Sequence, residues 1–130
     1  MPRILDTFSC GGGAGYGYHL AGFEVVGVDI QPQPNYPFEF IQADALDVLR
    51  DREFLAGFDA IHASPPCQAY TPLNHYNHRA YPDLVDETRE LLEASGLPYV
   101  IENVPQAPLR DPVILCGTMF GLRMYRHRGF

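Results

Sequence analysis

The 130-residue sequence contains no lysine and only three cysteines. Cys10, Cys67 and Cys116 form no CxxC pair and leave at least one thiol unpaired, so neither a disulfide framework nor a redox pair is indicated. No apolar run approaches the roughly 20 residues that span a bilayer, and the first residues, MPRILDTFSC, lack a signal-peptide pattern. We therefore expect reduced cysteines, a cytoplasmic location and no membrane association.

The absence of lysine leaves nine arginines against sixteen acidic residues, a net charge of −7. A protein that binds duplex nucleic acid by itself usually has a basic face. The charge therefore argues against independent, sequence-specific DNA binding. Four of the nine arginines lie in the last 21 residues, so we expect any positive surface near the C-terminus.

Short apolar runs alternate with turn signals, which is typical of βαβ units around a parallel sheet. The patterns predict strands at 4–8, 25–30, 38–42, 58–63, 99–104 and 113–116, and helices at 18–21, 44–55 and 82–95. We predict one domain of the α/β class with a Rossmann-like, doubly wound, mostly parallel sheet. Ligands of such sheets bind beyond the carboxyl ends of the strands. The segments that follow the first five strands are SCGGGAG, DIQ, ADA, SPPCQ and ENV.

The first of these segments is glycine-rich and is followed by a helix, whose N-terminus favours an anionic group. Asp29 ends the second strand, where an acid can accept hydrogen bonds from ribose hydroxyls. Together they predict a nucleoside cofactor rather than a structural turn beside a solvated acid. Asp44, after the third strand, has two equal interpretations: a contact to an adenine amino group, or a helix N-cap.

Cys67 follows two prolines at the end of the fourth strand. The prolines fix the backbone and present the side chain, which favours a nucleophile over a buried packing thiol. Glu102 follows the fifth strand and can exchange a proton with a ring nitrogen. Arg126 and Arg128 share a direction in an extended segment and can stabilise an anion, although composition alone favours a solvated basic tail.

The remaining candidates have weaker signals. His75 and His78 have HxxH spacing in a polar loop at 68–79, and we expect no metal there. His62 is expected to be a hydrogen-bonded core histidine. Cys10 and Cys116 are expected to be packing residues.

Four ordered motifs resemble those of the cytosine-C5 DNA methyltransferase family. DTFSCGGG is similar to the cofactor signature D-x-F-x-G-x-G-G, Pro66-Cys67-Gln68 to the nucleophile motif, and Glu102-Asn103-Val104 to the glutamate motif. Arg126-x-Arg128 is similar to the arginine pair that follows. Two positions differ from the family, because Cys10 replaces the first glycine of the loop and Met124 replaces the glutamine of Q-x-R-x-R.

The resemblance implies an S-adenosylmethionine-dependent methyltransferase fold, with a cofactor half at 1–57 and a catalytic half at 58–130. The implied cofactor-binding residues are Phe8, Ser9, Gly11, Gly12, Gly13, Asp29, Ile30, Asp44, Ala45 and Pro66. The implied catalytic residues are Cys67, Glu102, Arg126 and Arg128. The implied substrate-binding residues are Pro66, Gln68, Asn103 and Val104.

The implied reaction is methyl transfer to C5 of cytosine in DNA, through a covalent bond between Cys67 and C6. It fits restriction-modification or phage modification in a bacterial or phage-infected cell. The resemblance also implies that we should expect a short form of the family, without the target-recognition region and the C-terminal motifs. A second copy or a separate recognition chain is the expected partner. A tRNA cytosine-C5 methyltransferase and an inactive S-adenosylmethionine-binding module are the alternatives.

Overall fold

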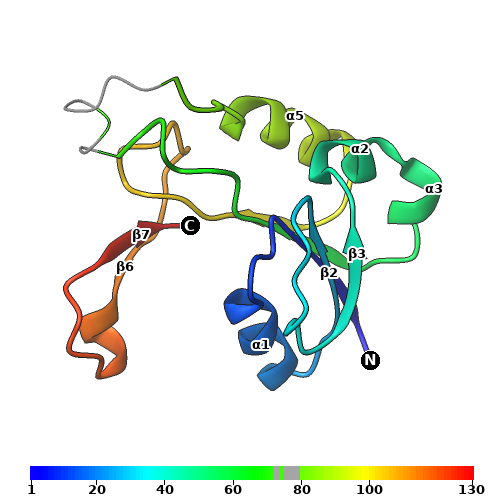
Figure 1. Cartoon of the computed structure of the whole chain (residues 1–130), viewed down its shortest axis with the longest axis horizontal. Coiled ribbons are helices and arrows are strands. Elements are labelled where there is room, and N and C mark those ends of the chain that lie inside the picture. Colours follow the sequence, from blue (N-terminus) through cyan, green and yellow to red (C-terminus); the bar gives the residue numbers. More distant parts are fainter. Residues whose placement is uncertain (72–73, 75–79) are drawn as a thin grey trace.

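Five parallel strands form the central sheet, with the order β3-β2-β1-β4-β5. The structure is a computed structural model that describes residues 1–71, 74 and 80–130 (Figure 1). The strands are β1 (Arg3–Thr7), β2 (Glu24–Asp29), β3 (Glu39–Gln42), β4 (Ala60–Ala63) and β5 (Tyr99–Ile101). The chain order reverses between β1 and β4, which defines the switch point where ligands of this fold class bind.

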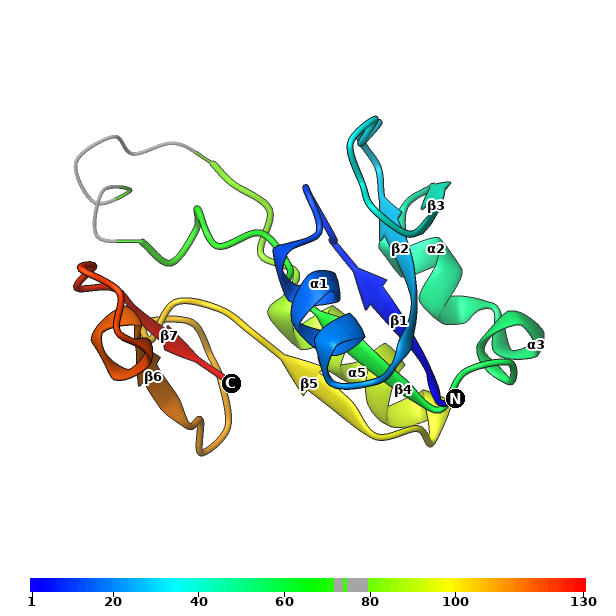
Figure 2. The ribbon, with the colours of Figure 1, turned by 90° about the horizontal axis from the view of Figure 1, so that it is seen from below.

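Helices cover both faces of the sheet (Figures 1 and 2). Helix α1 (Gly13–Leu20) lies on one face, and α2 (Ala45–Arg50), α3 (Arg52–Leu55) and α5 (Val85–Ser95) lie on the other. This arrangement confirms the predicted doubly wound α/β fold. None of the helices in the described ranges is long and apolar enough to cross a membrane.

The main core lies between the sheet and the α2–α3–α5 face. Leu5, Val26 and Ile61 of three adjacent strands are buried against Leu49 and Leu92 of the helices. Burying one such side chain stabilises the fold by about 1.5–3 kcal/mol. The β-branched strands are therefore fixed in the interior, and their carboxyl ends are held at one edge.

A tyrosine from the β2–β3 connection fills part of the opposite face. Tyr36 packs on Gly27 of β2, where an added Cβ would lie 2.3 Å from the Tyr36 ring. Its hydroxyl donates to the buried Asp6 carboxylate of β1 at 3.0 Å. Burial raises the pKa of Asp6 to about 6, although the hydrogen bonds from Tyr36 and from Gly15 oppose the rise.

Two helices differ from their predicted bounds. Helix α1 begins at Gly13, not at Tyr18, because Gly12 takes a left-handed φ of 94° as its N-cap. The helix predicted over 44–55 is divided into α2 and α3 at Asp51. The Asp51 side chain accepts from the backbone N–H of Phe54 at 3.0 Å and caps α3, which interrupts the first helix.

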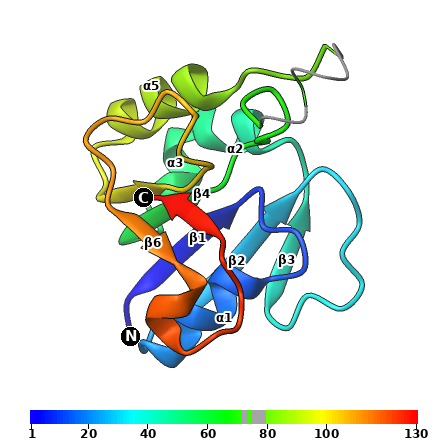
Figure 3. The same cartoon turned by 90° about the vertical axis from the view of Figure 1, so that its left-hand side faces the viewer.

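The C-terminal segment forms a separate antiparallel hairpin, not a basic tail. Strand β6 (Ile114–Cys116) pairs with β7 (His127–Gly129), and the short 3₁₀ helix η1 (Gly117–Phe120) follows β6. We call residues 113–130 the C-terminal arm. A backbone bridge between Asn103, which follows β5, and Gly129 holds the arm beyond the end of β5 (Figure 2). Strand β6 of the arm is in the foreground of Figure 3.

Candidate active site

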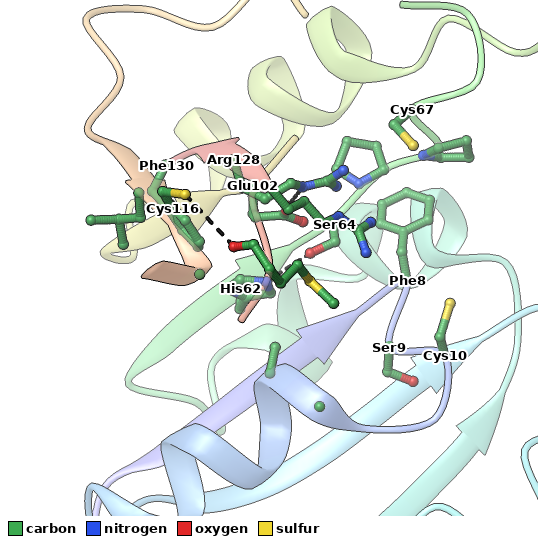
Figure 4. A pocket seen from close by; sticks show the side chains of 18 of the residues that line it. Phe8, Ser9, Cys10, His62, Ser64, Cys67, Glu102, Cys116, Arg128 and Phe130 are labelled. Atoms are coloured by element: carbon green, nitrogen blue, oxygen red, sulfur yellow. Dashed lines mark hydrogen bonds and ion pairs between the residues drawn. The ribbon is translucent and has the colours of Figure 1, made fainter. Parts of the chain in front are cut away.

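A cavity of about 870 Å³ lies between the carboxyl edge of the central sheet and the C-terminal arm. Its walls come from the loop after β1, the end of β4 with the SPPCQ turn, Glu102 after β5, and the arm (Figure 4). The four predicted catalytic residues all line it: Cys67, Glu102, Arg126 and Arg128. The fold thus brings residues separated by up to 61 positions to one cavity.

The loop after β1 has a strained backbone. Phe8 and Cys10 have positive φ values of 56° and 47°, which non-glycine residues rarely adopt. Asp29 holds the loop in place, since its carboxylate accepts from the backbone N–H of Cys10 and from that of Gln31, each at 2.9 Å. Cys10 is exposed and lines the cavity, so its predicted packing role was wrong: the turn directs its side chain outward.

The predicted cofactor residues divide into two groups. Phe8, Ser9, Gly13 and Pro66 line the cavity. The other predicted residues lie at or just after the carboxyl ends of β1, β2 and β3 but outside the cavity lining: Gly11, Gly12, Asp29, Ile30, Asp44 and Ala45. Asp44 caps α2 by accepting from the backbone N–H of Leu46 at 2.9 Å, so the N-cap interpretation is confirmed; its adenine contact stays a prediction.

Ser9 has an orphaned polar atom at the cavity wall. The residue is 7% exposed, and its hydroxyl has no hydrogen-bond partner within the described part of the chain. A buried hydroxyl without a partner costs free energy unless a ligand or water satisfies it. Ser9 therefore marks the side of the cavity where a polar ligand group fits.

The turn that carries Cys67 is anchored by a buried asparagine. The Asn103 side chain donates from Nδ2 to the backbone oxygen of Pro65 at 2.9 Å, and its Oδ1 accepts from the backbone N–H of Val104 at the same distance. Asn103 is fully buried, and neither it nor Val104 lines the cavity. The structure thus gives Asn103 a positioning role in place of the predicted substrate contact, whereas Gln68 does line the cavity.

Glu102 and Arg128 form an ion pair inside the cavity. Nε of Arg128 donates to Oε1 of Glu102, and only 21% and 14% of the two side chains are exposed. Burial by itself lowers the pKa of Arg128, but Glu102 and then Cys67 raise it above its ordinary value. A permanent positive charge therefore lies beside both the carboxylate and the thiol.

A chain of hydrogen bonds runs from α1 to the cavity wall. Nδ1 of His62 bonds to the Tyr18 hydroxyl and Nε2 to the Ser64 hydroxyl, both at 2.8 Å. His62 is 2% exposed, which confirms the predicted hydrogen-bonded core histidine. Burial lowers its pKa to about 4, with a smaller opposing effect from Glu102, so the ring is neutral at pH 7.

Two solved structures share this arrangement of strands and helices. The structure of the Dnmt2 methyltransferase from S. pombe matches with a TM-score of 0.66 and 20% identity, covering 98% of this chain and 48% of that one. A mutant DNMT2 from Spodoptera frugiperda matches with a TM-score of 0.71 and 18% identity, covering 99% of this chain and 48% of that one. The chain has a methyltransferase fold.

The methyltransferase fold predicted from the four motifs is thus confirmed. A third structure, from Haemophilus influenzae, has 15% identity and a TM-score of 0.57, covering 99% of this chain and 79% of that one. The chain spans about half the length of the two Dnmt2 proteins. No protein-family model and no curated protein matches the sequence.

Part of the cavity wall was not predicted. The arm contributes Leu115, Cys116, Gly117, Phe120 and Met124 to the wall opposite the β1 loop. The apolar run at 113–116 was a visible signal, but its place on a separate hairpin was not. Cys116 is buried, as expected of a packing thiol.

Some predicted features fall on residues that the structure does not describe. His75, His78 and most of the loop at 68–79 belong to residues 72–73 and 75–79, which the structure does not describe. Within the ranges that it does describe, no three metal-binding side chains converge.

Asp6 and His62 predict opposite responses of stability to pH. The folded-state pKa of Asp6 is raised from 3.8 to about 6, so protonation favours the fold and this residue adds stability as the pH falls from 6 to 4. The folded-state pKa of His62 is lowered from 6.5 to about 4, so the neutral ring favours the fold. This stability is fully present above pH 6.5 and is lost as the pH falls from 6.5 to 4. Each difference corresponds to about 3 kcal/mol, and the two nearly cancel.

Single substitutions should reveal each component. Between pH 6.5 and 4, Asp6→Asn should lose about 3 kcal/mol of unfolding free energy relative to wild type, and His62→Gln should gain about as much. Urea unfolding followed by circular dichroism at several pH values measures both. Parallel pH profiles for the two variants would show that these groups are not the source.

Proposed function

We propose that this chain transfers a methyl group from S-adenosylmethionine to C5 of a cytosine in nucleic acid, through a covalent bond between Cys67 Sγ and C6. The observation that carries the proposal is that Cys67 and the Glu102–Arg128 ion pair line the same cavity. A nucleophile, a carboxylate and a fixed cation are the groups that this addition requires. DNA is the first polymer to test, and RNA is the second.

The cavity fits the cofactor as well. Its volume of about 870 Å³ lies within the range of small-molecule sites, about 300–1,000 Å³. The unpartnered Ser9 hydroxyl offers a hydrogen bond, and Gly11 and Gly13 have no atoms within 4 Å of a built Cβ, which leaves open space over the loop. Phe8 offers an aromatic face, and Asp29 remains the candidate for the ribose. When bound, S-adenosylmethionine supplies an electrophilic methyl group.

Cys67 begins the reaction by adding its thiolate to C6 of the cytosine. A bond forms between Sγ and C6, and the electrons of the C5–C6 double bond move toward C5 and N3. Glu102 accepts from the 4-amino group and shares a proton with N3, which offsets the charge that develops there. Arg128 stabilises the same edge of the base and holds the Glu102 carboxylate in place.

Cys67 is released after C5 has received the methyl group. Loss of the C5 proton to a base restores the C5–C6 double bond and breaks the bond between Sγ and C6, which returns the thiolate. Asn103 acts only indirectly, by fixing the Pro65 carbonyl and hence the direction of the turn. For a polymer substrate the target base must leave its stack to reach the cavity.

A 5-fluorocytosine substrate tests this proposal, because fluorine at C5 cannot leave as a proton and the adduct persists. Mass spectrometry should detect a covalent complex on the Cys67 peptide when S-adenosylmethionine is present. Parallel reactions with single-stranded DNA, duplex DNA and a tRNA identify the polymer. Cofactor binding without any adduct would instead support an inactive S-adenosylmethionine-binding module.

A further inference from the structure

The charge of the chain is divided sharply between the C-terminal arm and the rest. Residues 1–111 contain all sixteen acidic residues and six of the nine arginines, which gives −10. Residues 112–130 contain the other three arginines and no acid, which gives +3. An asymmetry of this kind is typical of a segment that contacts a polyanion.

Two of the three arginines of the arm have no ion-pair partner in the part of the chain that the structure describes. Arg128 is paired with Glu102, but Arg123 and Arg126 are exposed and form no ion pair with any residue that the structure describes. By contrast, Arg50 and Arg110 in the body of the protein each pair with acids. The charge of Arg123 and Arg126 is therefore available to a ligand.

Aromatic rings lie between these cations. Tyr125 is 84% exposed, and its ring contacts that of His127 edge to face, with centroids 5.0 Å apart. Residues alternate along an extended segment, so Tyr125 and His127 lie on the side opposite Arg126 and Arg128, which line the cavity. One side of the segment thus faces the cavity, and the other side exposes the Tyr125 ring.

The combination favours nucleic acid over a protein partner. Met119, Phe120 and Leu122 also leave an exposed apolar surface at η1, which a protein could cover. However, an exposed tyrosine ring flanked along the chain by the exposed Arg123 and Arg126, on a segment whose other side lines the cavity, matches the stacking and phosphate contacts of single-stranded nucleic acid. Stacking requires an unpaired base, since the faces of a paired base are covered by its neighbours.

We propose that the C-terminal arm is a binding surface for unpaired nucleotides, in which Tyr125, on the side of the segment away from the cavity, stacks on an unpaired base and Arg123 contacts phosphate. The inference rests on the proposed function for the identity of the polymer. Binding of nucleotides to the arm does not depend on cytosine or on methyl transfer. It can therefore be tested on strands that cannot react.

Fluorescence anisotropy with thymine-only DNA and uracil-only RNA strands provides the test. Tyr125→Ala should weaken binding about 10-fold, and Tyr125→Phe should restore it, because stacking needs the ring and not the hydroxyl. Tyr99→Ala is the matched control, a partly exposed tyrosine at the amino end of β5. A duplex of the same length should bind more weakly than either strand.

Salt dependence tests the phosphate contact separately. Arg123→Gln should reduce the slope of log Kd against log salt by about 0.7, the value for one phosphate on a single strand. Arg52→Gln, an exposed position on α3, should leave the slope unchanged.

Three results would overturn the inference: equal effects of Tyr125→Ala and Tyr99→Ala, tighter binding of the duplex, or dissociation of a dimer by Tyr125→Ala with unchanged strand binding. If strand binding behaves as expected but 5-fluorocytosine is never trapped, the arm stands and the proposed reaction fails. If 5-fluorocytosine is trapped and Tyr125→Ala binds the strands as tightly as wild type, the proposed reaction is supported and the proposed role of the arm is wrong.

Discussion

Replacing Cys67 by serine is expected to reduce methyl transfer by at least about 1,000-fold and to abolish covalent trapping of 5-fluorocytosine. A serine hydroxyl ionises at a far higher pH than a thiol, so serine at this position supplies far less of the anionic nucleophile that the addition needs. The substitution changes one atom on a turn that prolines and Asn103 hold in place. Cofactor binding and unfolding free energy should therefore stay close to wild type.

The matched control is Cys116→Ser, which alters a second thiol of the same cavity. Cys116 is buried and accepts a hydrogen bond from the Thr118 hydroxyl at 3.2 Å, so we expect its variant to trap the substrate on Cys67 as wild type does. Labelled methyl transfer and peptide mass spectrometry measure both variants. Equal labelling by Cys67→Ser and wild type would remove Cys67 from the mechanism.

The central sheet and its functional edge could be predicted because they depend on local signals. Each parallel strand contains a short apolar run, and the predicted bounds agree with the structure to within three residues. β4 pairs with β5 as the prediction required, so the turn at Cys67 and Glu102 emerge at the same edge. The side-chain roles inferred there are still predictions, since only their positions are established.

The second strand of the arm and its pairing into a hairpin could not be predicted, because they depend on a long-range contact. HRG is too short, and contains glycine, so it gives no strand signal by itself. It becomes a strand only through pairing with β6 and through the bridge from Asn103 to Gly129. Gly129 also has Leu109 within 2.6 Å of a built Cβ, so the arm packs closely on the preceding loop.

The Asp6–Tyr36 contact was missed for a related reason. The prolines around Tyr36 indicated only an irregular loop, and nothing in it showed which residue would return to the sheet. One signal was available: Gly27 interrupts the strand EVVGVD, and a glycine inside a buried strand often marks a close approach by another group. The structure shows that this group is the Tyr36 ring.

Replacing Glu102 by glutamine is expected to lower kcat by about 100- to 10,000-fold, the range for loss of a general acid–base group. Glutamine keeps the shape and can still accept from Arg128, but it cannot share a proton with N3 of the base. It also leaves the half-buried Arg128 without a counter-charge. Glu93→Gln is the control, because Glu93 pairs with the exposed Arg110 on the surface of α5 and its loss should leave kcat unchanged.

A double-mutant cycle with Arg128→Gln then shows whether the pair acts as a unit. If Arg128 works mainly by orienting Glu102 and balancing the charge at the base edge, the double variant should be about as slow as the slower single variant. Independent contributions would instead multiply, and the double variant would be slower by the product of the two factors. Arg126→Gln distinguishes the two arginines: its side chain lines the cavity but does not pair with Glu102. The effects of Arg126→Gln and Glu102→Gln on the activation free energy should therefore add, so that their rate factors multiply. A non-additive result would mean that Arg126, rather than Arg128, holds the carboxylate during the reaction.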